Sequence, residues 1–182
     1  VLSRHLPVFV EALRHVGHHQ TRNRGTIGGS IAFGEPAAES PATALALGAT
    51  LRLASVRGER SVAMDDFYFG PYATAIEPDE LIIAIDVPDW ADGHVTLFRE
   101  VARRPGDFAL VGMVGAVTFD GDAVARAGLA WFGMGATPIR MKQVESALVG
   151  TARGDLDFDA LADAAIADTN PFDDKAASAE YR

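Results

Sequence analysis

The chain has 182 residues, 48% of them hydrophobic and 23% charged, which is typical of a folded globular protein and argues against disorder. Its formal net charge of −9 leaves no basic footprint for a nucleic-acid partner. The absence of cysteine excludes disulfides and cysteine-held iron–sulfur or zinc sites within this chain and fits a reducing cytoplasm, and no apolar run approaches the roughly 18–20 residues that span a bilayer.

The first elements along the chain are expected to be helical. Pro7–Val16 carries apolar residues at helical spacing, and its proline suits the first turn of a helix. A polar, basic stretch follows, and Gly25–Gly34 is then rich in glycine. Ser40 and Pro41, a cap residue followed by proline, predict a short helix that ends at Gly48.

Strands are expected next. Thr50–Val56 alternates apolar and polar residues, and Arg57-Gly58 turns the chain back toward Val62. Leu81–Val87 is a more continuously apolar strand. The cluster of breakers in Pro88–Gly93 predicts a linker between two strands.

The second half is predicted to be an antiparallel sheet followed by helices. Asp120-Gly121-Asp122 is a strong hairpin signal. The predicted strands cover Val95–Val101, Leu110–Phe119 and Val124–Phe132, and the predicted helices cover Met141–Val149, Phe158–Ala167 and a last segment from Lys175. These patterns predict an α+β fold with a first domain at residues 1–90 and a second domain at residues 91–182.

The glycine cluster Gly25-Thr26-Ile27-Gly28-Gly29-Ser30 is the best candidate for a ligand contact. Backbone without side chains lets a ligand approach closely, and consecutive N–H groups can face phosphate or ring oxygens. The spacing matches neither the Gly-x-Gly-x-x-Gly pattern of a dinucleotide fold nor a P-loop. Taken alone, the cluster is better explained by a tight turn between two elements.

Ordered motifs run along essentially the whole chain. They are Gln20–Ser30, Pro36–Pro41, Asp66–Gly70, Pro78–Ile82, Phe98–Arg104, Gly106–Ala109 and Ala177–Arg182. Together they closely resemble the medium, FAD-binding subunits of the xanthine dehydrogenase and carbon monoxide dehydrogenase family of molybdenum hydroxylases. Because the matches keep their order over the whole length, the resemblance is highly specific.

The resemblance implies a fold and an incomplete cradle for the cofactor. The implied fold is the second subdomain of a PCMH-type FAD-binding domain, followed by an antiparallel sheet plus helices like the C-terminal domain of the carbon monoxide dehydrogenase flavoprotein. Relatives begin with a smaller subdomain whose own glycine loop holds the flavin pyrophosphate, and no such loop precedes residue 25 here. We therefore expect that subdomain to be absent, the chain to stop within a helix at Arg182, and residues 1–182 alone to be folded but inactive and free of FAD.

The glycine cluster is implied to contact the cofactor. In the family this segment lies against the phosphate and ribityl region of FAD, which assigns Thr26, Ile27, Gly28, Gly29 and Ser30 to cofactor binding. Relatives often have Asn or Asp at the position of Ser30. A serine hydroxyl still forms a hydrogen bond there but reaches less far than an amide.

Four further residues match flavin contacts of the family. Glu39 matches an acidic contact, and Ile82 matches a position that packs on the cofactor. Arg99 matches a basic position near the ring, where positive charge stabilises a reduced, anionic flavin. Phe108 matches a residue that covers one ring face and governs access of the electron acceptor. Structural alternatives stay open for all four, namely a helix-start carboxylate, a solvent-facing arginine and two core residues.

Other polar clusters are given no role in chemistry. The adjacent His18 and His19 have poor spacing for a metal site and are expected at the surface. The pairs Asp65-Asp66 and Asp173-Asp174 lie beside turns without a visible base or nucleophile, and we expect them to act as caps and solvated turns.

The implied function is electron transfer in an FAD-dependent oxidoreductase subunit. Electrons leave a substrate at a molybdenum cofactor on a large subunit, cross iron–sulfur clusters on a small subunit, and reach FAD in this subunit before passing to an external acceptor. The molybdenum and the clusters belong to those partner subunits, and no residue of this chain is expected to be catalytic. Two alternatives stay open: a subunit-interaction module that no longer binds flavin, and a flavin reductase unrelated to molybdenum.

Overall fold

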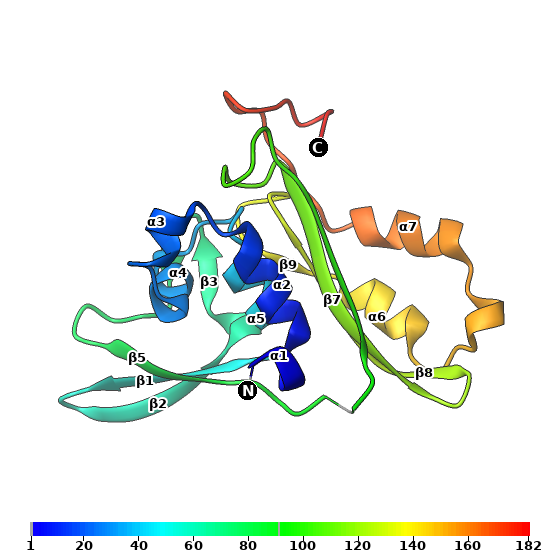
Figure 1. The fold of residues 1–182 in the computed structure, drawn as a ribbon, viewed down its shortest axis with the longest axis horizontal. Coiled ribbons are helices and arrows are strands. Elements are labelled where there is room, and N and C mark those ends of the chain that lie inside the picture. The colour runs from blue at the N-terminus through cyan, green and yellow to red at the C-terminus, as the bar shows by residue number, and fades with distance from the viewer. Residues whose placement is uncertain (1, 91) are drawn as a thin grey trace.

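The computed structural model describes residues 2–90 and 92–182 and shows an α+β fold, as predicted (Figure 1). The first half contains α1 (Leu2–His5), α2 (Pro7–His15), α3 (His19–Arg22), α4 (Ile27–Phe33), α5 (Glu39–Ala46), β1 (Thr50–Ser55), β2 (Gly58–Ala63), η1 (Met64–Asp66), β3 (Tyr68–Gly70), β4 (Ala73–Thr74) and β5 (Leu81–Asp86). The second half contains β6 (Val95–Val101), β7 (Val111–Asp120), β8 (Ala123–Phe132), β9 (Ile139–Arg140), α6 (Lys142–Leu148), η2 (Arg153–Asp155) and α7 (Phe158–Ile166).

Two antiparallel sheets form the framework. The first has the strand order β2-β1-β5, and the second has the order β6-β7-β8-β9. A small hairpin of β3 and β4 stands apart from both. Strands β7 and β8 turn at the predicted Asp120–Asp122 hairpin, where Asp120 pairs with Ala123. The alternation of apolar and polar residues therefore located the longer strands to within one or two residues, whereas the short strands β3, β4 and β9 were not predicted.

The core lies between helices and the four-stranded sheet. Helices α2 and α5 pack on one face of β6, β7 and β8, while α6 packs on the other face against β8 and contacts α7 (Figure 1). Every residue of α5 is buried. One hydrophobic cluster joins both halves of the chain, from Leu51 and Leu53 of β1 to Val114 of β7 and Phe132 of β8. Among the described residues, no helix is long and apolar enough to cross a membrane.

The glycine-rich segment is a helix rather than the expected loop. Helix α4 begins after Thr26, whose Oγ1 accepts a hydrogen bond from the Gly29 N–H at 2.9 Å. Gly34 ends the helix in the left-handed conformation, with φ 71°. Two glycines disfavour a helix in isolation, but Ile31 is completely buried and anchors α4 on the core. Tertiary packing has overridden local propensity here.

Two other local predictions were wrong. Helix α5 begins at Glu39 after Ala38, so Ser40 lies inside its first turn and is not the cap. The last segment is not helical, and residues 175–182 form turns. Asp174 Oδ1 accepts hydrogen bonds from two backbone N–H groups there, and Asp174 Oδ2 lies 2.6 Å from Arg182 Nη2. Local side-chain bonds to the backbone thus compete with the helix.

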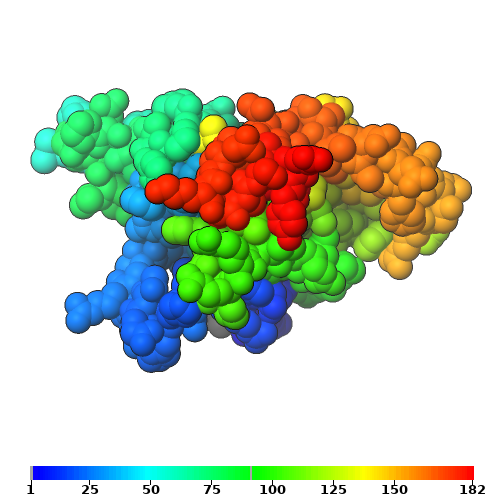
Figure 2. Space-filling view, turned by 90° about the horizontal axis from the view of Figure 1, so that it is seen from above, coloured from blue at the N-terminus to red at the C-terminus, as the bar shows by residue number. Residues whose placement is uncertain are grey.

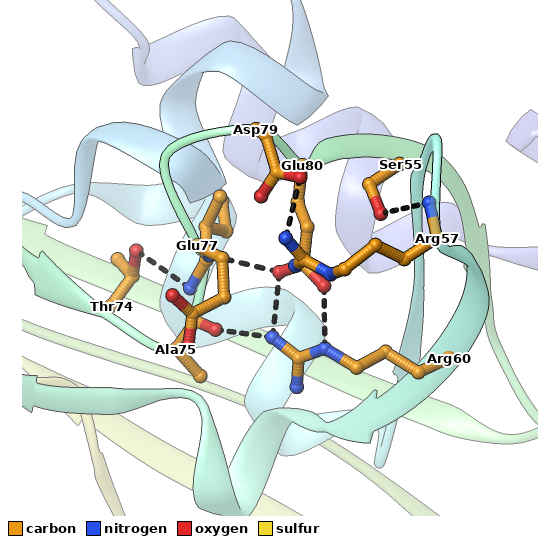
Figure 3. A network of polar contacts seen from close by, with 9 residues as sticks. Ser55, Arg57, Arg60, Thr74, Ala75, Glu77, Asp79 and Glu80 are labelled. Atoms are coloured by element: carbon orange, nitrogen blue, oxygen red, sulfur yellow. Dashed lines mark hydrogen bonds and ion pairs between the residues drawn. The ribbon is translucent and has the colours of Figure 1, made fainter.

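Ion pairs fasten the chain at two places. On the β2–β5 side, Arg60 holds Glu80 through two hydrogen bonds of 2.7 Å and also donates to the Ala75 carbonyl (Figure 3). Elsewhere, Asp65 lies 2.9 Å from Arg140 and 2.8 Å from Lys142. Asp65 was expected to be a solvated turn residue, and it instead joins the first half of the chain to the second.

Candidate cofactor-binding cavity

A cavity of about 880 Å³ opens beside the first turn of α4. Its walls come from four segments of the chain, at residues 13–17, 21–30, 33–40 and 106–108. The volume lies in the range of sites that hold drug-sized ligands or cofactors. The cavity therefore joins the end of α2, the glycine segment and the start of α5 to a loop from the second half of the chain.

The α4 wall offers backbone donors. The N–H groups of Ile27 and Gly28 belong to the first helical turn, where no intrahelical acceptor exists. Gly29 faces the cavity, and a β-carbon there would lie 2.9 Å from Thr26 Oγ1, which leaves no space for a side chain without breaking the cap. Arg22 and Arg24 line the same end. This end of the cavity suits an anionic group such as a phosphate.

The opposite wall is the loop at residues 106–108. Gly106 has φ 86°, and a β-carbon there would lie 2.6 Å from the His18 ring, so only glycine permits this approach. His18 is exposed, as predicted, and its ring lies against this loop. Phe108 lines the cavity with 57% of its surface exposed, which leaves an aromatic face for a ligand and excludes the core alternative.

A second cavity of about 420 Å³ adjoins the Phe108 loop and shares Glu35, Gly106, Asp107 and Phe108 with the first. Its floor is held by Arg182, which donates to the Leu110 carbonyl at 2.6 Å. Figure 2 shows the C-terminal segment, in red, lying against the green part of the chain that contains this loop. The C-terminal turns thus support the loop that walls the first cavity.

A buried carboxylate faces the cavity from the start of α5. Glu39 lines the cavity and is only 3% exposed. Burial raises the pKa of Glu39 above its ordinary value, and a hydrogen bond from its own backbone N–H opposes that rise. The helix-start role proposed from the sequence and a ligand-facing role are therefore compatible in one residue.

Glu100 is a functional candidate that the sequence analysis missed. The β6 register pairs Phe98 with Val114 and Glu100 with Gly112, so Phe98 and Glu100 share the inner face of the sheet. The Glu100 side chain is 4% exposed, and its Oε2 lies 3.6 Å from His15 Nδ1 without a hydrogen bond. Burial, and then the charge of Glu39, raise the pKa of Glu100 to about 7.

Strand alternation was the signal that could have revealed Glu100. Phe98 is apolar, and a residue two positions later must share its face. The same alternation turns Arg99 outward: it is exposed, donates to the Phe98 carbonyl at 2.8 Å and lines a separate hollow beside Pro7 and Glu11.

The structure brings together six of the nine residues assigned to the cofactor. The cavity is lined by Thr26, Ile27, Gly29, Ser30, Glu39 and Phe108. Among the described residues, Gly28, Ile82 and Arg99 do not line it. Ile82 packs partly buried against the core from β5. The contacts of these three residues with a cofactor stay predictions.

Two family descriptions match the chain. Residues 1–90 match the FAD binding domain in molybdopterin dehydrogenase, and residues 96–182 match the CO dehydrogenase flavoprotein C-terminal domain. The two matched segments meet near Trp90, close to the linker predicted from the sequence.

Curated proteins and solved structures resemble the chain over its full length. The 6-hydroxypseudooxynicotine dehydrogenase complex subunit alpha of Paenarthrobacter nicotinovorans is 37% identical over 182 residues, which cover 100% of this chain and 62% of that protein. The carbon monoxide dehydrogenase medium chain of Hydrogenophaga pseudoflava is 34% identical, with 100% and 63% covered. A solved carbon monoxide dehydrogenase from the same organism superposes with a TM-score of 0.95 at 35% identity, over 99% of this chain and 63% of the other. The chain thus spans less than two thirds of these relatives.

Proposed function

Because the chain belongs to the family of FAD-binding medium subunits of molybdenum-containing dehydrogenases, we propose that its 880 Å³ cavity holds FAD and that it transfers electrons. The electrons come from iron–sulfur clusters of a small partner subunit, after oxidation of a substrate at a molybdenum cofactor on a large partner subunit. They leave toward an external acceptor. The proposed compartment is the cytoplasm, with which the lack of cysteine is compatible.

The residues of the cavity fit FAD. One end offers the backbone N–H group of Ile27, which has no intrahelical acceptor, with two arginines nearby, which suits phosphate oxygens. The remainder is walled by apolar side chains such as Leu13, Val16 and Phe108, which suit an aromatic ring system. This combination of a polar end and an apolar body in one cavity is the observation that carries the proposal.

The bound flavin would supply two-electron and one-electron redox chemistry, and the chain supplies position and electrostatics. Thr26 holds the first turn of α4 in place, so its free N–H groups face one direction. Phe108 lines both cavities, and in this proposal its ring covers one face of the flavin and restricts access of water and acceptor. Residues 1–90 form the proposed FAD domain, and residues 91–182 contribute the Phe108 loop as the proposed second domain.

FAD titration of the full natural polypeptide and of glycine variants tests the proposal. Gly29→Val should weaken FAD binding by about tenfold or more, equivalent to at least about 1.4 kcal/mol, because its β-carbon would lie 2.9 Å from Thr26 Oγ1 and displace the cap at the cavity wall. Gly28→Val should do the same if the cofactor lies on the first turn, because a β-carbon there meets no protein atom within 4 Å.

Matched variants separate a steric effect from a loss of folding. Gly154→Val adds the same side chain in η2, where a β-carbon also meets nothing within 4 Å, and should bind FAD like the wild type. Thr26→Ala removes only the cap. Full FAD occupancy in both Gly28→Val and Gly29→Val would contradict the proposal and favour a subunit-interaction module without flavin.

A further inference from the structure

Three ionisable side chains, His15, Glu100 and Glu39, differ in their access to solvent and to the cavity. His15, at the end of α2, has 40% of its side chain exposed. Its Nδ1 lies 3.6 Å from Oε2 of Glu100, whose side chain is almost completely buried. Glu39, equally buried, lines the cavity itself. The negative charge of Glu39 acts on Glu100, so the two buried carboxyl groups lie in one electrostatic neighbourhood. The segment of α2 that carries His15 also reaches the cavity, because Leu13 and Val16 line it.

Among the described residues, no arginine or lysine forms an ion pair with Glu39 or Glu100, although Arg22 and Arg24 line the same cavity as Glu39. On α2, the groups near Glu100 are His15 and Glu11, and Glu11 Oε1 lies 3.8 Å from His15 Nε2. Arg14 of the same helix is paired with Glu11 at 2.9 Å. On β7, the residue opposite Glu100 is Gly112. Arg99, next in the strand, is turned to the outer face. Within the described residues, the His15 imidazole is therefore the one basic side chain within ion-pair distance of Glu100.

Electrostatics makes the pair responsive to charge. Two carboxyl groups in one buried region share protons, since ionising one raises the pKa of the other. Burial and the charge of Glu39 already raise the pKa of Glu100 to about 7, so Glu100 is poised between its two forms near neutral pH. Additional negative charge in the adjacent cavity raises it further and draws in a proton.

We propose that Glu100, which is coupled electrostatically to Glu39, takes up a proton at Oε2 by way of His15 when reduction brings negative charge into the cavity. The inference rests on the proposed function, because it requires FAD in the cavity. The electrons come from the reductant, which is an iron–sulfur cluster in the proposed complex. The proton comes from water, passes through the imidazole and forms an O–H bond on the Glu100 carboxylate.

Proton uptake on reduction is the decisive measurement. The full natural polypeptide with FAD is reduced by dithionite without oxygen in weak buffer, and the protons taken up are counted with a pH indicator between pH 6 and pH 9. The wild type should take up more protons per FAD near pH 7 than at pH 9, by as much as one. Glu100→Gln should abolish this excess and its pH dependence. Glu100→Asp keeps a carboxyl group and should restore part of it.

Glu11→Gln is the matched control, because Glu11 also approaches His15 but lies at the surface. It should leave the excess uptake unchanged. A second readout does not depend on counting protons: the infrared difference spectrum between reduced and oxidised protein should gain a carboxylic-acid band in the wild type and lose it in Glu100→Gln. Glu39→Gln should also reduce the band, because it removes the charge that couples Glu100 to the cavity.

The outcomes separate the two claims. FAD that binds and is reduced with the same proton uptake in wild type and Glu100→Gln overturns the inference alone. Failure of the wild type to bind FAD overturns the proposed function and this inference with it. If Glu100→Gln does not fold, the wild-type infrared spectrum decides: a carboxylic-acid band that appears on reduction supports the inference, and its absence contradicts it.

Discussion

Two regions of the molecule each bury a glutamate, and they treat it in opposite ways. In the turn between β4 and β5, the side chain of Glu80 is 5% exposed and is held by both nitrogens of the Arg60 fork (Figure 3). On the inner face of β6, the side chain of Glu100 is 4% exposed, has no hydrogen-bond partner and lies 3.6 Å from the His15 ring. The hydrogen bonds of Arg60 lower the pKa of Glu80 to about 2, while burial raises that of Glu100 to about 7.

The difference shows that the partner, and not the degree of burial, decides the charge of a buried carboxyl group. At the turn, Glu80 also accepts a hydrogen bond from the Glu77 N–H, so its charge is permanently useful for holding the chain. At the cavity, an unpaired carboxyl group costs stability at neutral pH, and folding alone gives no reason to keep it. The unpaired Glu100 is coupled to Glu39, which lines the cavity where a ligand is proposed to bind.

The largest expected effect on stability comes from removing the arginine partner of Glu80, which would leave that carboxyl group unpaired like Glu100. Arg60→Ala leaves Glu80 without its main partner and should lower the melting temperature by several degrees near neutral pH. Arg52→Ala is the matched control, because Arg52 pairs with Asp86 on the same sheet and both side chains are about half exposed. Equal melting temperatures for the two variants in thermal denaturation would contradict the distinction.

Acid should remove the effect of Arg60. The pKa of Glu80 is lowered in the fold, so its stabilisation is present above the ordinary value of 4.5 and is lost as the pH falls toward about 2. The difference in stability between wild type and Arg60→Ala should therefore shrink across that range, as measured by chemical denaturation. A difference that stays constant with pH would mean that Arg60 acts through packing only.

The stability contribution of Glu100 is expected to depend on pH in the opposite direction. Because the pKa of Glu100 is raised, the wild type loses stability as the pH rises from 4.5 through about 7. Glu100→Gln removes this loss, so its stability relative to the wild type should rise by about 1–2 kcal/mol between pH 4.5 and pH 8, allowing for solvent screening. Glu59→Gln, exposed on β2, should show no such trend in the same denaturation series.

A smaller effect is expected from giving Glu100 an arginine partner like that of Glu80. In the wild type, His15 Nδ1 lies 3.6 Å from Glu100 Oε2. His15→Arg places a permanent cation at this position and should lower the pKa of Glu100 by about 1 or more. Carbon-13 NMR of labelled glutamate follows the titration directly. The variant should also lose part of the proton uptake on reduction. A titration of Glu100 that is unchanged by the arginine would show that the two side chains do not interact.

The smallest expected effect compares two helix caps. Thr26→Ala removes the hydrogen bond to the Gly29 N–H in the cavity wall, and Asp157→Ala removes the equivalent bond to the Ala160 N–H in α7. Each should cost about 0.5–1 kcal/mol of stability in denaturation experiments. Only Thr26→Ala should also weaken FAD binding, because only that helix begins at the cavity. Equal FAD affinity in the two variants would show that the Thr26 cap does not contribute to FAD binding.

Much of the fold could be predicted because strands and their turns have local causes. Alternation gave β6 its observed bounds, and the Asp-Gly turn placed the β7–β8 hairpin. Helix α4 could not be predicted, because its two glycines oppose a helix and the burial of Ile31, a tertiary effect, supports it. The terminal turns were missed for a related reason, since Asp174 bonds to the backbone in competition with a helix.

The site was predictable only in part, because its walls are distant in sequence. The glycine segment indicates a ligand contact by composition, whereas the approach of Phe108 depends on Gly106 resting against His18 across the fold. Only the family resemblance brought Phe108 into the predicted site. Glu100 became visible when the sheet register fixed which face of β6 it occupies.

The central claim is that FAD lies in the cavity between the first turn of α4 and the Phe108 loop. A crystal structure of the full natural polypeptide with FAD tests it most directly. The account predicts flavin density in this cavity, with phosphate oxygens near the N–H groups of Ile27 and Gly28 and with Glu39 at its wall. FAD bound at another place, with this cavity filled only by water, would contradict it.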